Sequence, residues 1–333
     1  MPFDHIVSRF FPHTHYQVQS GETGWNNTTR YVETEEGRYV LRIYETHRES
    51  AKIRFEHEVL LALDTCQLPV ATPIPMRTVE GDTYVLVEDG SERYACMFRY
   101  LPGVRPNGML KETAYSKGQV MGILSKALAN VQVSVPPAYP PYYELDSAHP
   151  TCSQEKIAAF CLTPPAPFED QADELKEIYS ALMNFRAHVP ELRALPHQLV
   201  HGDVNDSNLL VHEQKQLEIS AVLDFEFCTL DLRAMEPAVV LSGMLVEEPA
   251  WDAIDAFLRG YRSVIQLSEE ERRAMPFLIQ LRKLDVFVHF LGRYFDQVDR
   301  SEVLVEQIQD AAKGLRMLHI HNQRIKEFIE ATV

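Results

Sequence analysis

The residue pattern of this 333-residue chain changes near residue 101. Before that point, short runs of β-branched and aromatic residues are separated by turn signals, and one helical pattern, 49–64, interrupts them. After Leu101-Pro102-Gly103 the apolar residues recur mostly at helical spacing. We therefore expect an α+β protein with two lobes. Residues 1–100 would form a small antiparallel β-rich lobe with one helix, and residues 101–333 a larger, mostly helical lobe.

The individual elements follow from the same patterns. A short amphipathic helix is expected over 3–11. The expected strands of the first lobe are 16–19, 28–33, 38–44, 74–79, 83–87 and 93–99. The expected helices of the second lobe are 113–131, 153–161, 170–188, 231–245, 251–261, 268–295 and 301–329.

Composition narrows the class of protein. No apolar run approaches the roughly 20 residues that cross a bilayer, and the start of the chain has neither a basic nor an apolar targeting region. The five cysteines form no CxxC pair, which is typical of free thiols in a reducing compartment. The formal net charge of −16 argues against affinity for nucleic acid or for anionic membranes. We expect a soluble enzyme of the cytoplasm; the oligomeric state stays open.

Two strand-like runs end in polar side chains. His201-Gly202-Asp203 follows the apolar run 198–200, and Asn208 lies five residues after Asp203. The second run, 219–223, ends in Asp224-Phe225-Glu226. Phosphoryl transfer requires a carboxylate that takes the proton of the attacking hydroxyl, and hard oxygen ligands for Mg²⁺. Both are present on loops at strand ends.

This arrangement resembles the superfamily of aminoglycoside phosphotransferases, choline kinases and type II homoserine kinases, which have a protein-kinase-like fold. Protein kinases carry His-Arg-Asp-x4-Asn and then Asp-Phe-Gly, whereas this chain has His-Gly-Asp-x4-Asn and then Asp-Phe-Glu. The resemblance implies that Asp203 is the catalytic base and that Asn208 and Asp224 are Mg²⁺ ligands. It implies that His201 braces the loop, and it places Glu236 as an acidic residue against that loop. Helix N-terminal packing is the alternative role for Glu236.

The turn 21–28 lies between two expected strands, and backbone amides in such a turn can cover phosphates. Gly24 is the candidate glycine. The resemblance implies an asparagine at this turn, and either Asn26 or Asn27 fits. A plain hairpin is the alternative.

The strand 39–44 resembles the one that presents a phosphate-binding lysine, but Arg42 stands at that position. Arginine keeps the charge in a bulkier, forked group. We expect Arg42 to meet phosphates or a glutamate of the following helix, with Glu58 as the first candidate and Glu56 as the second. A solvated helix charge is the alternative for Glu58, and an altered nucleotide site is the alternative for Arg42.

By position, 94–101 resembles the hinge that meets the adenine of ATP. Backbone groups of Met97, Phe98 and Tyr100 would make these contacts.

On the helical run 277–295, Arg282, His289 and Arg293 fall at i, i+7 and i+11, on one face. Such a positive stripe predicts an anionic partner, whether a substrate carboxylate or acidic residues of the protein itself.

The expected function is ATP- and Mg²⁺-dependent transfer of a γ-phosphate to a hydroxyl of a small molecule. The acceptor would be homoserine-like, aminoglycoside-like or another amino-alcohol. The alternative is a non-catalytic nucleotide-binding or structural relative, such as a spore-coat-type member of the fold. Arg42 favours the alternative, while the intact Asp203, Asn208 and Asp224 disfavour it.

Overall fold

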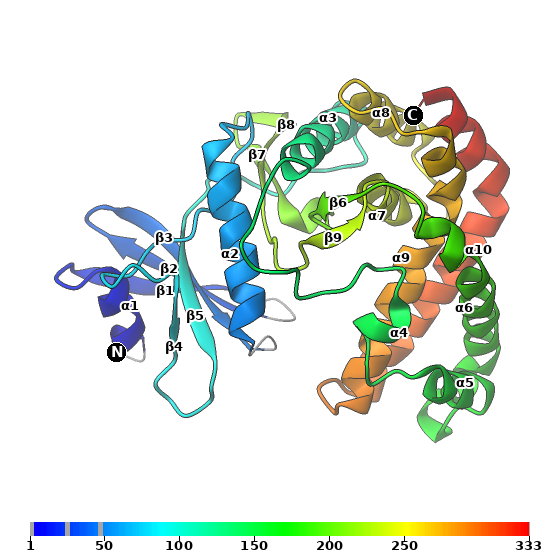
Figure 1. Ribbon diagram of the computed structural model, residues 1–333, viewed down its shortest axis with the longest axis horizontal. Helices are drawn as coiled ribbons and strands as arrows, with labels where there is room; N and C mark the ends of the chain where they lie inside the picture. The colour runs from blue at the N-terminus through cyan, green and yellow to red at the C-terminus, as the bar shows by residue number, and fades with distance from the viewer. Residues whose placement is uncertain (1–2, 24–26, 46–48, 333) are drawn as a thin grey trace.

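The structure, a computed structural model, describes residues 3–23, 27–45 and 49–332, and a five-stranded antiparallel sheet forms most of its N-terminal part (Figure 1). The strands lie side by side in the order β1-β2-β3-β5-β4. Their bounds are β1 (Tyr16–Thr23), β2 (Asn27–Thr34), β3 (Gly37–Tyr44), β4 (Tyr84–Leu86) and β5 (Tyr94–Arg99). Two helices accompany the sheet, α1 (Asp4–Phe10) and α2 (Ser50–Thr65).

The alternation of side chains along the strands divides the apolar residues between the two helices. Ala95 and Met97 of β5 pack in the cluster that contains α1, whereas Cys96 and Phe98 pack in the cluster that contains α2. Arg42 of β3 is paired with Cys96. Because directly paired residues point to the same face of a sheet, Arg42 lies on the face covered by α2.

The predicted strand 74–79 is wrong. This segment forms only an isolated bridge, between Pro75 and Phe98. Proline has no N–H to donate to a ladder, so Pro73 and Pro75 prevent regular pairing. The other five predicted strands correspond to β1–β5, and the predicted helix 49–64 corresponds to α2.

The C-terminal part is mostly helical, and α9 and α10 pack against each other along one side of it (Figure 1). Its helices are α3 (Lys111–Leu128), α4 (Leu145–Ala148), α5 (Gln154–Leu162), the 3-10 helix η1 (Ala166–Gln171), α6 (Ala172–Leu192), the 3-10 helix η2 (Asp206–Asn208), α7 (Met235–Met244), α8 (Trp251–Arg262), α9 (Glu269–Phe295) and α10 (Ser301–Thr332). Two short antiparallel pairs join β6 (His197–Val200) to β9 (Thr229–Leu232) and β7 (Leu209–His212) to β8 (Lys215–Val222).

The predicted helix 231–245 begins too early. Its first residues belong to β9, which pairs Asp231 with Gln198 and Thr229 with Val200, and α7 begins only at Met235. Helical periodicity cannot reveal this pairing, because the partner strand lies elsewhere in the sequence. The β6–β9 pair anchors the end of β6, directly before His201.

The start of α9 follows from a local signal. Ser268 accepts a hydrogen bond from the backbone N–H of Glu271, and the Glu271 side chain accepts one from the Ser268 backbone N–H, 2.7 Å. This capping box satisfies two N–H groups that a helix start leaves without partners.

One large apolar core extends from α2 through β7 and β8 into the C-terminal helices. The expected α+β class, with an N-terminal antiparallel sheet and a larger helical part, is confirmed. Since residues before and after residue 100 share this core, a domain boundary at residue 100 stays a proposal. None of the helices within the described ranges combines the length and the hydropathy that crossing a membrane requires.

Candidate active site

His201 joins the two loops that carry the predicted catalytic residues. Its side chain is fully buried. Its Nδ1 accepts the backbone N–H of Asp203 (3.2 Å), so the ring proton lies on Nε2, which donates to the backbone carbonyl of Leu223 (2.9 Å). Burial lowers the pKa of His201, which keeps the ring neutral. The neutral ring makes two hydrogen bonds, and through them it holds the start of one loop against the end of the strand before Asp224.

Asp203, Asn208 and Asp224 come together at these two loops. The Nδ2 of Asn208 donates to the backbone carbonyl of Asp203 (2.9 Å) and to its Oδ2 (3.0 Å). The backbone N–H of Leu223 donates to the carbonyl of Asn208 (2.8 Å), which places Asp224 beside this pair. Asp224 adopts a left-handed backbone conformation, φ 66°. The carboxylate oxygens of Asp224 and the amide oxygen of Asn208 are hard donors of the kind that suits Mg²⁺.

Arg42 connects the sheet to this site. Its Nη2 lies 3.2 Å from Asp224 Oδ1, and its Nη1 lies 3.0 Å from Glu56 Oε1 on α2. The Tyr44 hydroxyl donates to the other oxygen of Glu56, at 2.9 Å. Burial raises the pKa of Glu56, and the Arg42 guanidinium counteracts that rise. The cation therefore bridges a buried helix carboxylate and the predicted metal-binding carboxylate.

The prediction that Glu58 is the partner of Arg42 is wrong, and the second candidate, Glu56, makes the contact. Glu58 accepts hydrogen bonds from the backbone N–H of Ser134 (2.7 Å) and from its hydroxyl (2.9 Å), and lies 3.6 Å from Arg54. Positions two apart on a helix differ by about 200°, so the two glutamates face opposite sides. The apolar face of α2 could have identified Glu56, because Leu60 follows it at i+4.

The predicted phosphate turn is only partly described. Gly24 and Asn26 lie outside the described residues. Asn27 begins β2, and its Nδ2 donates to Glu226 Oε2 at 2.8 Å; both residues are buried. Glu226, which the sequence patterns do not single out as a site residue, thus links the Asp-Phe-Glu segment to the sheet.

The predicted hinge residues use part of their backbone within the protein. The carbonyl of Met97 accepts the N–H of Met76 (2.7 Å), and the N–H of Tyr100 donates to the carbonyl of Arg38 (3.1 Å). Phe98 faces α2, where its ring lies 5.1 Å from the Arg42 guanidinium carbon. Adenine binding by this segment stays a prediction.

The predicted positive stripe on α9 separates into three environments. Arg282 forms an ion pair with the Asp203 carboxylate and lies 3.8 Å from Asp285. His289 is beside His149, with ring centroids 5.8 Å apart, and burial lowers its pKa to about 4. Arg293 donates to Asp299 at 2.9 Å, which is an internal ion pair. Only Arg282 of the stripe contacts the predicted catalytic carboxylate.

Two buried carboxyl groups hold the backbone around the predicted catalytic loop, residues 201–208. Glu236, at the start of α7, accepts a hydrogen bond from the backbone N–H of His201. Asp231 accepts those of Tyr142 (2.7 Å) and Leu232 (2.6 Å). Burial raises the pKa of each carboxyl group to about 7. Glu236 therefore contacts the loop where the resemblance places an acidic residue.

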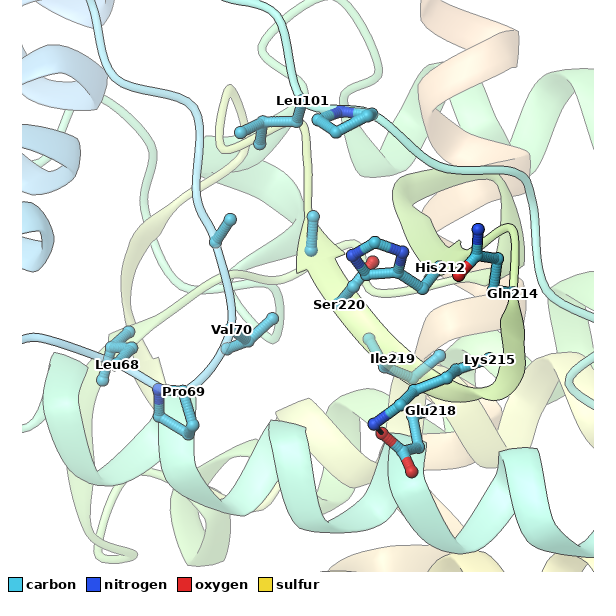
Figure 2. A pocket seen from close by; sticks show the side chains of 13 residues that line it. Leu68, Pro69, Val70, Leu101, His212, Gln214, Lys215, Glu218, Ile219 and Ser220 are labelled. Carbon is cyan, nitrogen blue, oxygen red and sulfur yellow. Dashed lines mark hydrogen bonds and ion pairs between the residues drawn. The ribbon is translucent and has the colours of Figure 1, made fainter.

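One cavity lies where residues 68–71 and 101–102 meet the β7–β8 hairpin, and a second lies among helices of the C-terminal part. The larger, about 620 Å³, is formed by Leu68, Pro69 and Val70 facing the β7–β8 hairpin, where Lys215 and Glu218 form an ion pair at 3.3 Å (Figure 2). It is not lined by the catalytic loop or by Asp224. The smaller, about 200 Å³, is bordered by Asn205 of the catalytic loop and by Arg282.

Comparisons with known proteins agree with this geometry. A model of the phosphotransferase enzyme family matches residues 18–277. Hydroxylysine kinase of Xenopus laevis is 24% identical over 307 residues, which cover 84% of this chain and 78% of that protein. Homoserine kinase of Mesorhizobium japonicum is 24% identical over 306 residues, which cover 90% of this chain and 86% of that protein.

Solved structures share the fold. A microcompartment-associated aminopropanol kinase superposes with a TM-score of 0.67 at 16% identity, over 97% of both chains. An amicoumacin kinase in complex with AMP-PNP and Ca²⁺ superposes with a TM-score of 0.65 at 19% identity, over 92% of this chain and 91% of that one. The kinase-like fold and the class of enzyme, a small-molecule kinase, are confirmed. Because the family match extends over more than half of its length, the chain belongs to the phosphotransferase enzyme family.

Proposed function

We propose that this protein transfers the γ-phosphate of ATP, with Mg²⁺, to the hydroxyl group of a small amino-alcohol. The observation that carries the proposal is the assembly of Asp203, Asn208 and Asp224 on two adjoining loops, with Arg42 directed at them from the sheet. The names of the similar proteins, which are kinases of homoserine, hydroxylysine and aminopropanol, support an acceptor that carries both a hydroxyl and an amine.

Asp203 is the general base of this reaction. Its carboxylate accepts the proton that the acceptor hydroxyl loses as the acceptor oxygen bonds to the transferred phosphorus, and ADP leaves. Asn208 and Asp224 would hold Mg²⁺, which would supply positive charge to offset that of the phosphates. His201 and Glu236 position the loop through the backbone contacts described above.

The nucleotide lies on the sheet side in this proposal. Arg42 binds phosphate oxygens, and Glu56 orients its guanidinium. The remaining proposed nucleotide contacts are Gly24, Asn26 or Asn27, Met97, Phe98 and Tyr100.

Release of ADP in the presence of Mg·ATP and a panel of acceptors tests the proposal. The panel is L-homoserine, 5-hydroxy-L-lysine, aminopropanol, choline and an aminoglycoside. We expect at least one acceptor to stimulate ADP release, and Asp203→Asn to lower kcat by about 10²- to 10⁴-fold while the protein still binds AMP-PNP.

Two results would contradict the proposal. Full turnover in Asp203→Asn would exclude Asp203 as the base. Binding of Mg·ATP without stimulation by any acceptor would favour a non-catalytic relative of the fold.

A further inference from the structure

The smaller cavity lies between α7, α9 and α10 and adjoins the catalytic loop. Its volume is about 200 Å³. Pockets for drug-sized ligands have about 300–1,000 Å³, so this cavity suits a small metabolite rather than an aminoglycoside. Its polar lining residues are Asn205, Ser242, Arg282, Lys283, Gln307 and Asp310.

Two neighbouring cations, Arg282 and Lys283, line this cavity. Within the described ranges, no carboxylate lies at ion-pairing distance from the Lys283 ammonium. Burial and the adjacent Arg282 lower the pKa of Lys283, and the charge of Asp310 counteracts part of this shift. The stem of Lys283 packs on Gly314 of α10, where a Cβ would lie 2.6 Å from Lys283 Cε. The ammonium group is thus partly dehydrated, and a bound anion would stabilise its charged form.

A third group independently indicates a ligand. Ser242 of α7 is only 2% exposed, and its hydroxyl has no hydrogen-bond partner among the residues that the structure describes. A buried hydroxyl without a partner is unfavourable, and in most proteins such a group is satisfied. Ser242 lines the cavity, and a ligand atom that accepts hydrogen bonds would satisfy this hydroxyl on reaching it.

The cavity is connected to the catalytic carboxylate. Arg282 lines the cavity and also forms the ion pair with Asp203, and Asn205 lies two residues after Asp203 in the same loop. The cavity therefore borders the loop of Asp203, and a molecule bound in it lies beside Arg282, the ion-pair partner of that carboxylate. Asp310, the acidic residue of the lining, is exposed and favours a cationic group.

We propose that this cavity binds the carboxylate of a hydroxy-amino acid, with Arg282, Lys283 and Ser242 as carboxylate partners and Asp310 facing the ammonium. The proposal rests on the proposed function and restricts its acceptors to amino acids. Two cations and one carboxylate complement a zwitterion, and they disfavour an amine that lacks the carboxylate.

Paired probes test it on the full-length protein. L-homoserine is compared with 3-aminopropan-1-ol, which lacks only the carboxylate, and L-threonine is compared with 1-aminopropan-2-ol in the same way. A third carboxylate probe is 5-hydroxy-L-lysine. Isothermal titration gives the Kd of each probe, and ADP release gives kcat and KM.

We expect the wild-type protein to prefer at least one of the amino acids to its decarboxylated counterpart. Since a hydrogen bond to a charged group contributes about 1.5–3 kcal/mol, Lys283→Met should lower this preference about tenfold or more. Lys283→Arg should retain most of it, and Ser242→Ala should lower it less than Lys283→Met does. Lys313→Met, an exposed lysine of α10 outside the cavity, is the matched control and should keep the wild-type preference.

The outcomes separate the two proposals. If an amino acid binds through Lys283 but no phosphate is transferred, the carboxylate site stands and the proposed function fails. If the decarboxylated amines are phosphorylated as well as the amino acids, or if Lys283→Met keeps the preference, the carboxylate site is excluded and the kinase function stands. If none of the three amino acids binds, the carboxylate site is excluded.

Discussion

Arg42 and Asp224 form an ion pair at 3.2 Å that joins the N-terminal sheet to the loop of the predicted metal ligands. The same guanidinium holds Glu56 at 3.0 Å with its other arm. A forked group can serve two carboxylates at once, which the single ammonium of lysine does with less defined geometry. The arginine that replaces the expected lysine is therefore integrated into the site.

We expect Arg42→Met to destabilise the fold strongly. Glu56 is 3% exposed, and removing its counter-charge leaves a buried carboxylate unpaired, which typically costs about 3–5 kcal/mol. Arg54→Met, which removes an exposed cation 3.6 Å from Glu58, should cost less than about 1 kcal/mol. Urea unfolding of both variants measures the difference, and equal losses would show that the Arg42–Glu56 pair contributes little.

The two glutamates of α2 should differ in their effect on catalysis. Glu56→Gln frees the Arg42 guanidinium from its helix partner. Since Arg42 is the proposed phosphate-binding group, its displacement should lower kcat/KM by about 10- to 100-fold. Glu58→Gln changes only contacts with Ser134 and Arg54, so kcat/KM for ATP should stay within about twofold. Steady-state kinetics with the best acceptor compare the two variants. A larger effect of Glu58→Gln would contradict the orientation of α2 in which Glu56, and not Glu58, faces Arg42.

Stability should depend on pH through Glu236. Its folded-state pKa of about 7 lies above the usual value of about 4.3, so between these pH values the folded protein binds more protons than the unfolded chain. The contribution of this group to the free energy of unfolding is therefore present at low pH and is lost as the pH rises towards 7. Each pH unit in that window changes it by at most about 1.4 kcal/mol.

Glu236→Gln removes this dependence. The free energy of unfolding of the variant minus that of the wild type should increase as the pH rises from about 5 to about 8. Urea unfolding at both pH values measures this change. The exposed Glu248→Gln is the control and should show the same difference from the wild type at both. A constant difference for Glu236→Gln would mean that Glu236 titrates normally in the folded protein.

The catalytic loop is also held from α3. Asp206 forms an ion pair with Lys117, which is 3% exposed, and accepts the backbone N–H of Gly108 at 2.9 Å. Lys117→Met should displace the loop and lower kcat about tenfold. The exposed Lys126→Met on the same helix should leave kcat within about twofold, because Lys126 is far along the helix from this contact. Unchanged kcat in Lys117→Met would show that the loop keeps its place without this pair.

Local sequence patterns predicted most of the elements, and they failed for two different reasons. The segment 74–79 has strand-like residues, but Pro75 within it and Pro73 before it allow only an isolated bridge. The helical periodicity after Asp231 begins within a strand, because β6 supplies a ladder that no local pattern contains. In contrast, the start of α9 is set by neighbouring residues, Ser268 and Glu271, and was predicted at that position.

The sequence by itself indicated the family and predicted the chemistry of the site, because the types and spacing of Asp203, Asn208 and Asp224 are local properties of two loops. Only the tertiary structure decided which cation meets which carboxylate. Arg282 reaches Asp203 across 79 positions of the chain, and Arg42 selects Glu56 by the direction in which α2 packs. These contacts depend on how helices and sheet pack together, and periodicity within one element does not contain that information.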